Sequence, residues 1–212
     1  MQTKAQNIER LKSLSKRLGI RPADVKVRAK DGSARGITLS FGYRDATITR
    51  HCEVEPTRDA NFNHLVNWMA DLVRNLERRI ETLEEAFYAD GVRQLPAHAD
   101  SWVGTLRENH YTGEKTPREA LDMIVGALHR LEFSEDDVKV VWHDDPNEAL
   151  LRLRIGPGRV MEKRSTLQED PRRNLVALAL WLQGRARHVE RGIETIERVA
   201  SPYLQLGAGG TR

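Results

Sequence analysis

Ile80-Glu81-Thr82-Leu83-Glu84 is repeated, 113 residues further along the chain, as Ile193-Glu194-Thr195-Ile196-Glu197. At the same spacing, an ungapped comparison of residues 24–85 with residues 137–198 finds 15 identities in 62 positions. The identical pairs include Asn61 with Asn174, Leu65 with Leu178, Trp68 with Trp181, and Glu77-Arg78 with Glu190-Arg191. Self-similarity at a fixed period is typical of a duplicated structural unit. The sequence therefore predicts that one unit is written twice.

Each predicted unit opens with an amphipathic helix. Its apolar residues recur every three or four positions, which places them on one face of a helix. These residues are Ile8, Leu11, Leu14 and Leu18 in the first copy, and Leu121, Ile124, Leu128 and Leu131 in the second. Thr116 followed by Pro117 is a good N-cap and first residue for the second helix.

Three short strands are expected after each opening helix. They are residues 25–30, 37–41 and 46–54 in the first copy, and residues 138–142, 151–155 and 160–167 in the second. Apolar residues alternate in the middle strands, at 37, 39 and 41 and at 151, 153 and 155, which gives each strand one apolar face. We match these faces with an offset of 114 rather than 113, and we therefore expect the first hairpin to be one residue longer in the second copy.

A long helix is expected to close each unit, because apolar residues keep helical spacing over residues 62–87 and 175–200. The predicted fold class is α+β: a duplicated αβββα unit whose antiparallel three-stranded meanders pack against long helices, with a pseudo-twofold axis between the copies. The expected domains are residues 1–87 and 115–204, with a linker over residues 88–114 and a flexible tail over residues 205–212. Two separate bodies are the alternative to one pseudo-symmetric body.

The composition is that of a folded protein with well-mixed charges. Of the 212 residues, 39% are hydrophobic and 31% are charged, yet the formal net charge is only +3. This balance excludes a strong overall field that would attract a polyanion, and it leaves room for local basic surfaces. The single cysteine, Cys52, excludes an internal disulfide and is typical of a reducing compartment. We therefore expect a cytoplasmic protein, and because no apolar run approaches the length of a membrane span, we expect no membrane as a partner.

Several short motifs lie near the ends of the two predicted units. They are Asn174-Leu175, Glu190-Arg191-Gly192-Ile193, Glu84-Glu85-Ala86-Phe87, Leu95-Pro96 and Trp102-Val103-Gly104-Thr105-Leu106. Over about residues 37–106, this pattern resembles the region that precedes the J domain in some bacterial and phage J-domain proteins. The His-Pro-Asp motif of a J domain is absent, since His143-Asp144-Asp145-Pro146 has the wrong order. The resemblance therefore implies a recruitment module of a kind carried by mobile elements, without stimulation of a chaperone ATPase.

No residue pattern points to catalysis or to a metal. None of the seven histidines has the i, i+4 spacing of a helical zinc pair. His51 and Cys52 are neighbours on a predicted strand, so they point to opposite faces, and we expect Cys52 in the core. The repeated glutamates, including Glu81 and Glu194, are expected on a solvated helix face. Trp68 and Trp181 are expected to pack between helix and sheet or between the two copies.

A cluster of basic residues is the strongest functional signal in the sequence. It is concentrated in the second copy, on the third strand and the closing helix, and it has an echo in the first copy. Its members are Arg159, Lys163, Arg164, Arg172, Arg173, Arg185, Arg187 and Arg191, with Arg50, Arg74 and Arg78 in the first copy. Two such surfaces could follow a phosphate backbone.

The sequence thus favours a non-enzymatic protein, without a cofactor or a metal, that binds another macromolecule. The leading hypothesis is a protein partner, which an adaptor or recruitment module would bind. DNA or RNA bound by the basic cluster is the alternative. Self-association and a small-ligand pocket between the two copies remain open at this point.

Overall fold

The computed structural model describes residues 2–43, 46–78, 82–87, 90, 115–143, 147–166 and 168–206. The chain forms two compact units. Unit 1 comprises Met1–Asn109 and His188–Thr195, and unit 2 comprises His110–Arg187 and Ile196–Arg212. Except for Asp90, the predicted linker lies outside the described residues. The segment 188–195, which the sequence assigns to the second copy, therefore belongs to unit 1.

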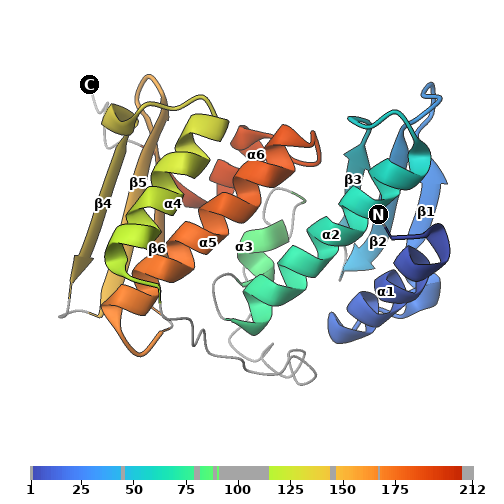
Figure 1. Cartoon of the computed structure of the whole chain (residues 1–212), viewed down its shortest axis with the longest axis horizontal. Coiled ribbons are helices and arrows are strands. Elements are labelled where there is room, and N and C mark those ends of the chain that lie inside the picture. The colour runs from blue at the N-terminus through green and yellow to red at the C-terminus, as the bar shows by residue number, and fades with distance from the viewer. Residues whose placement is uncertain are drawn as a thin grey trace. The chain divides into compact units, whose positions relative to one another are not determined.

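Unit 1 is an antiparallel three-stranded sheet covered by helices, as the sequence predicts. The strands have the order β1-β2-β3, and Figure 1 shows α1 and α2 lying side by side in front of them. The elements are α1 (Lys4–Arg17), the 3-10 helix η1 (Pro22–Asp24), β1 (Lys26–Ala29), β2 (Ile37–Tyr43), β3 (Ala46–Cys52), α2 (Arg58–Glu77) and α3 (Leu83–Phe87).

The core of unit 1 follows from the period of two in its strands. In β2, Ile37, Leu39 and Phe41 point inward and are buried. In β3, Ile48, Arg50 and Cys52 also point inward. The apolar stripes of α1 and α2 cover this face and contribute a core that also contains Trp68. The predicted stripe of α1 is buried from Leu11 onward, whereas Ile8 is 38% exposed.

Unit 2 has the same order of elements over most of its length. The elements are α4 (Pro117–Arg130), η4 (Glu135–Asp137), β4 (Val138–His143), β5 (Glu148–Gly156), β6 (Arg159–Ser165), α5 (Pro171–Glu190), α6 (Ile196–Ala200), η5 (Ser201–Tyr203) and β7 (Leu204–Leu206). The sheet has four strands in the order β4-β5-β6-β7, one more than predicted. Since β7 pairs with β6, residues 205 and 206 form part of a strand rather than the predicted flexible tail. Residues 207–212 lie outside the described residues.

The strand registers correct the predicted alignment of the two middle strands. Leu39 of β2 pairs with Arg50 of β3, and Leu151 of β5 pairs with Lys163 of β6. Arg50 and Lys163 are 113 residues apart, whereas Leu39 and Leu151 are 112 apart. The predicted offset of 114 is therefore wrong, and the first hairpin is one residue shorter in the second copy. A bulge after Arg154 in β5 restores the spacing.

A long helix follows the strands in each unit, as predicted, but it ends earlier than the predicted residues 87 and 200. In each unit this 20-residue helix, α2 or α5, is followed after a break by a short helix. At the end of α5, Gly192 adopts a φ of 61°, and its N–H donates to the carbonyl of Val189 at 2.8 Å. The N–H of Ile193 donates to the carbonyl of His188 at 2.9 Å. These two bonds form a Schellman motif, which ends the helix at the glycine. No described helix is long and apolar enough to cross a membrane.

Candidate functional site in unit 1

A groove with a volume of about 500 Å³ opens in unit 1 between α1, β1 and the first turns of α2. Most of its surface is apolar, and the Ile8 and Val27 side chains within it are 38% and 39% exposed. Exposed apolar side chains gathered on one concave surface are typical of a binding site. The apolar residues that line the groove are Ile8, Leu11, Pro22, Val25, Val27, Ala29, Ile37 and Phe62.

Strand β1 forms one wall of this groove. It is an edge strand, and among the described residues it pairs with β2 alone. Alternation places Val27 and Ala29 on one face of the strand and Arg28 on the other, yet all three line the groove. The groove therefore borders the unpaired backbone edge of β1. Such an edge can accept an extended peptide as an additional strand.

The charged side chains around the groove are mostly cationic. Lys4, Lys12, Arg28 and Arg58 line it, against one carboxylate, Asp59. The Lys12 ammonium also pairs with Glu9 on the exposed side of α1, at 2.7 Å. A rim of this composition favours a negatively charged ligand and disfavours a positively charged one.

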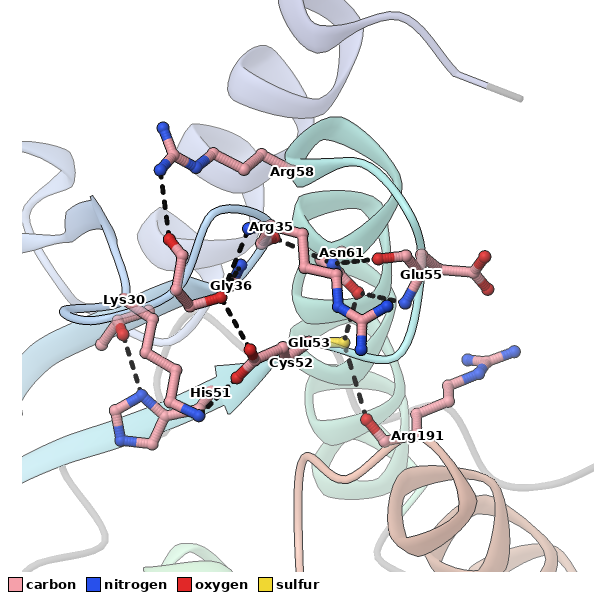
Figure 2. A network of polar contacts seen from close by, with 12 residues as sticks. Lys30, Arg35, Gly36, His51, Cys52, Glu53, Glu55, Arg58, Asn61 and Arg191 are labelled. Atoms are coloured by element: carbon pink, nitrogen blue, oxygen red, sulfur yellow. Dashed lines mark hydrogen bonds and ion pairs between the residues drawn. The ribbon is translucent and has the colours of Figure 1, made fainter.

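Asn61 fixes the start of α2 to the loops beside the groove. Its Nδ2 donates to the carbonyls of Arg35 and Glu55, each at 3.0 Å, and its Oδ1 accepts from the Glu55 N–H at 2.9 Å. The thiol of Cys52 donates to the same Oδ1 at 3.3 Å. Figure 2 shows these bonds converging on Asn61. Because Phe62 is the next residue, the network also holds this part of the groove wall.

Asn174 makes the corresponding bonds in unit 2. Its Oδ1 accepts from the Ser165 hydroxyl and from the Gln168 N–H, both at 3.0 Å. Ser165 and Gln168 stand 113 residues after Cys52 and Glu55. The two buried asparagines therefore close equivalent strand-to-helix connections.

The loop between β1 and β2 is held by a second set of polar contacts (Figure 2). The Glu53 carboxylate accepts from Lys30 Nζ at 2.5 Å and from Ser33 Oγ at 2.7 Å, and these hydrogen bonds hold the pKa of Glu53 below its ordinary value. Ser33 Oγ accepts from the Gly36 N–H at 2.7 Å. Arg58 Nη2 donates to the Ser33 carbonyl at 3.2 Å. The loop that joins two groove residues, Ala29 and Ile37, thus has a defined conformation.

Unit 1 also buries an ionic cluster centred on Arg50, whose side chain is 1% exposed. The two terminal nitrogens of Arg50 donate to the two carboxylate oxygens of Asp90, each at 3.0 Å. Its Nε lies 3.7 Å from Glu194 Oε1, and its Cζ lies 4.9 Å from the centroid of the Trp68 ring. Trp68 Nε1 donates to Glu194 Oε1 at 3.3 Å. Bidentate pairing and a cation–π contact together compensate the buried guanidinium.

The ionic cluster continues to the surface through His188. Its Nδ1 lies 3.6 Å from Glu194 Oε2, and its Nε2 lies 3.2 Å from Asp71 Oδ2. Asp71 in turn pairs with Arg74 at 2.9 Å. These contacts hold the segment 188–195 within unit 1. Because the side chains of the central members are 3% exposed or less, we interpret the cluster as a structural anchor rather than as a ligand site.

Three members of the predicted basic cluster are buried and cannot reach a phosphate backbone. They are Arg50, Lys163 and Arg185, which are 1%, 3% and 7% exposed. Arg50 and Lys163 point inward because each is in phase with the buried residues of its strand. Lys163 Nζ lies 4.9 Å from the ring centroid of Tyr203 and 6.0 Å from that of Trp181.

The remaining members of the basic cluster are spread over both units. Arg74, Arg159, Arg164 and Arg172 are exposed, and Arg78, Arg173, Arg187 and Arg191 are half-buried. Arg74, Arg78 and Arg191 belong to unit 1, and the others belong to unit 2. Of the eleven predicted residues, three are thus buried, and the other eight are divided between the two units.

On the outer face of the unit 2 sheet, arginines are compensated by carboxylates. Arg152 Nε donates to Glu162 Oε2 at 2.7 Å, and Arg164 Nη2 donates to Glu162 Oε1 at 2.6 Å. Burial raises the pKa of Glu162, but the hydrogen bonds from the two arginines outweigh it and hold that pKa below its ordinary value. Arg164 also pairs with Glu148 at 3.2 Å. This face carries less uncompensated positive charge than the sequence indicates.

The predictions for Cys52 and Trp68 are confirmed, and Trp181 is also buried. Cys52 is buried, and burial raises the pKa of its thiol, while His51 lies on the exposed face and hydrogen-bonds Thr38 at 2.8 Å. Trp68 packs between α2 and the sheet, with its ring centroid 6.4 Å from that of Phe41.

The prediction of a solvated glutamate face is wrong at Glu194, whose side chain is buried in the ionic cluster. Its partner in the repeat, Glu81, lies outside the described residues. No group of three or more potential metal ligands occurs in the part of the chain that the structure describes.

Comparison with known proteins adds no relative. The chain matches no protein-family model, no curated protein and no solved structure.

Proposed function

We propose that this protein is a non-enzymatic adaptor or recruitment module that binds an acidic, amphipathic segment of another protein in the groove of unit 1. One observation carries the proposal: an exposed apolar surface, a strand edge that has no partner among the described residues, and a cationic rim occur together. An extended segment with alternating apolar and acidic residues complements all three. Its backbone pairs with β1, its apolar side chains cover Ile8 and Val27, and its carboxylates face the rim.

The size of the groove sets the expected strength of binding. One strand added to a short edge buries less surface than a standard protein–protein interface, so we expect reversible binding with a dissociation constant of roughly micromolar order. Because the rim charges are exposed, this affinity should fall as the salt concentration rises. The hairpin loop and the start of α2 are fixed by the Asn61 network, which limits the entropy lost on binding.

The non-enzymatic part of the proposal rests on the environments of the reactive groups. The Cys52 thiol is buried and its pKa is raised, which opposes formation of a nucleophilic thiolate. Glu194 is paired with Arg50 and Trp68 in the core. If a hydrolase or transferase screen gave turnover that a Glu194→Gln substitution abolished without unfolding, this part of the proposal would be wrong.

The groove hypothesis is tested by panning a peptide phage library against the full chain and against an Ile8→Asp/Val27→Asp variant. We expect the wild type to select peptides rich in Asp and Glu with alternating apolar residues. A selected peptide, labelled with fluorescein, should lose at least about tenfold in affinity for the variant, because two apolar contacts are lost and two repulsive charges are added.

Val54→Asp is the matched control, because Val54 is also an exposed apolar residue of unit 1, at 45% exposure, and it does not line the groove. This variant should bind the peptide like the wild type. Selection of basic or neutral peptides, or equal binding by the wild type and the groove variant, would contradict the proposal.

DNA or RNA binding is the second candidate function, and the exposed Arg159 and Arg172 of unit 2 favour it. A fluorescence-anisotropy titration with an oligonucleotide over a salt series tests it. A steep salt dependence that Arg159→Gln/Arg172→Gln reduces would support this function, and the absence of binding at low salt would exclude it.

The proposal places the protein in the cytoplasm, where the single cysteine would remain reduced. The similarity to the region ahead of the J domain fits recruitment in a mobile-element context. The motifs Leu95-Pro96 and Trp102–Leu106, which contribute to that similarity, lie outside the described residues.

A further inference from the structure

A second concave site of unit 1 lies between the C-terminal halves of α1 and α2. It has a volume of about 280 Å³, which is slightly below the roughly 300–1,000 Å³ of pockets for drug-sized ligands. The residues that line it are Arg10, Ser13, Leu14, Arg17, Ala70, Arg74, Glu77 and Arg78. Four of these eight are arginines, and one is acidic. No residue is shared with the peptide groove.

Helical spacing explains why these arginines face one another. In α1, Arg10 and Arg17 are seven residues apart, so they lie on one face, two turns from each other. In α2, Arg74 and the C-cap residue Arg78 are four apart, and they also share a face. The two helices are joined by contacts from Arg10 to Asn67 and from Arg17 to Glu77, which hold the two basic faces together.

The positive charge of this pocket is only partly compensated. Arg17 pairs with Glu77, and Arg74 pairs with Asp71. Arg10, by contrast, donates to two neutral amide oxygens, of Asn67 at 2.7 Å and of Gln2 at 3.3 Å. Within the described part of the chain, no carboxylate pairs with Arg10. The lining carries four guanidinium groups and one carboxylate, Glu77, and Asp71 is a second carboxylate that contacts Arg74.

We propose that this pocket binds a phosphate group of a small molecule. Guanidinium groups donate pairs of parallel hydrogen bonds that match the oxygens of a phosphate, and several of them around one concavity favour an anion with at least two charges. The Ser13 hydroxyl, which also lines the pocket, adds a donor. The alternative is a structural role, because arginines near the C-terminal end of a helix stabilise it by compensating the helix dipole. If this were their only role, the pocket would not bind an anion.

Inorganic pyrophosphate is the probe, titrated into the full chain by isothermal titration calorimetry at fixed ionic strength. We expect one saturable site per chain. The Arg10→Gln/Arg78→Gln variant should bind at least about tenfold more weakly, because each arginine loses hydrogen bonds to a charged ligand. The control is Arg21→Gln/Arg35→Gln, which removes the same charge from exposed arginines of unit 1 outside the pocket and should not change the affinity.

Several outcomes would overturn this proposal. Among them are the absence of saturable binding, and an equal loss of affinity in the pocket variant and the control. If an oligonucleotide binds through the pocket and pyrophosphate does not, the ligand is a polymer and not a small molecule.

Should the glutamine variant fail to fold, Arg10→Lys/Arg78→Lys decides, since it keeps the charge but loses the paired donors. Its affinity should fall several-fold, and an unchanged affinity would contradict the proposed contacts.

Discussion

Gly36 shows how a single residue fixes the border of the peptide groove. A Cβ at this position would lie 2.8 Å from Lys30 Cβ and 2.8 Å from Ser33 Oγ, closer than packed atoms allow. We therefore expect Gly36→Ala to lower the free energy of unfolding by about 1–3 kcal/mol, because the loop must open to admit the methyl group. Chemical denaturation of the full chain measures this loss.

The control for this substitution is Gly42→Ala, at the far end of β2. An added Cβ there meets no atom within 4 Å, so this variant should unfold at nearly the wild-type denaturant concentration. Equal effects of the two substitutions would mean that the close approach at Gly36 does not constrain the loop.

Arg50 is the residue at which charge and burial are in greatest conflict. Its guanidinium is compensated chiefly by Asp90, and both side chains are 3% exposed or less. Removing one partner of a buried pair leaves an uncompensated charge, so we expect Asp90→Asn to destabilise unit 1 by about 3–5 kcal/mol. Urea denaturation followed by Trp fluorescence reports this change.

The exposed pair of Arg21 and Asp24 provides the comparison, since Asp24→Asn also removes one carboxylate from an arginine. Its effect on the denaturation midpoint should be small, because exposed ion pairs contribute little. A small effect of Asp90→Asn as well would show that Arg50 does not depend on Asp90 for compensation.

At the scale of the element, β6 illustrates a strand whose charged residues have two different roles. Lys163 points into the core, whereas Glu162 lies under Arg152 and Arg164 on the other face. Alternation in the sequence contains this information, because Lys163 is in phase with Met161 and Ser165. Residue type alone predicts that Arg50 and Lys163 contact nucleic acid, whereas their phase in the strand places them in the core.

The Glu162 carboxylate predicts a pH dependence of stability. Its pKa in the folded state is lowered, so its contribution to stability is present above the ordinary carboxyl pKa and is lost as the pH falls through the lowered value. We therefore expect Glu162→Gln to reduce the free energy of unfolding at about pH 7, and the difference from wild type to shrink toward about pH 3. A difference that is constant with pH would mean that ionisation of Glu162 does not contribute.

The element boundaries show what sequence patterns determine and what they leave open. The period of two correctly predicts the buried faces of β2 and β5. Offsets of 112 and 114 residues between the two strands differ by two residues, so both match the same buried faces, and the pattern could not decide between them. Helical spacing likewise continues across the end of α5. The break depends on the backbone conformation of Gly192, which the apolar pattern does not encode.

At the scale of the whole molecule, the units do not coincide with the segments that the repeat defines. The segment 188–195 supplies Glu194 to Arg50 and Trp68 of unit 1, and the Arg191 carbonyl accepts from Cys52 at 3.6 Å. A contact between residues more than 120 positions apart leaves no signal in local periodicity. The identity of Glu81 with Glu194 was visible in the sequence, but its burial was not.

The sequence patterns also could not predict the groove, because they do not show which apolar residues lie at the edge of the sheet. Ile8 belongs to the apolar stripe of α1, and Val27 alternates correctly in β1, so both are expected in the core. In the part of the chain that the structure describes, the sheet ends at β1, and both side chains are exposed at this edge. The phosphate pocket was partly visible, because Arg74 and Arg78 were among the predicted basic residues, whereas Arg10 and Arg17 were not.

Peptide binding at the β1 edge is the central claim, and amide chemical-shift mapping tests it most directly. The full chain, labelled with ¹⁵N, is titrated with a peptide selected in the panning experiment. We predict saturable shifts for residues 25–29 and for Ile8 and Phe62, with little change near Val54. Shifts confined to unit 2, or spread evenly over the chain, would contradict the claim.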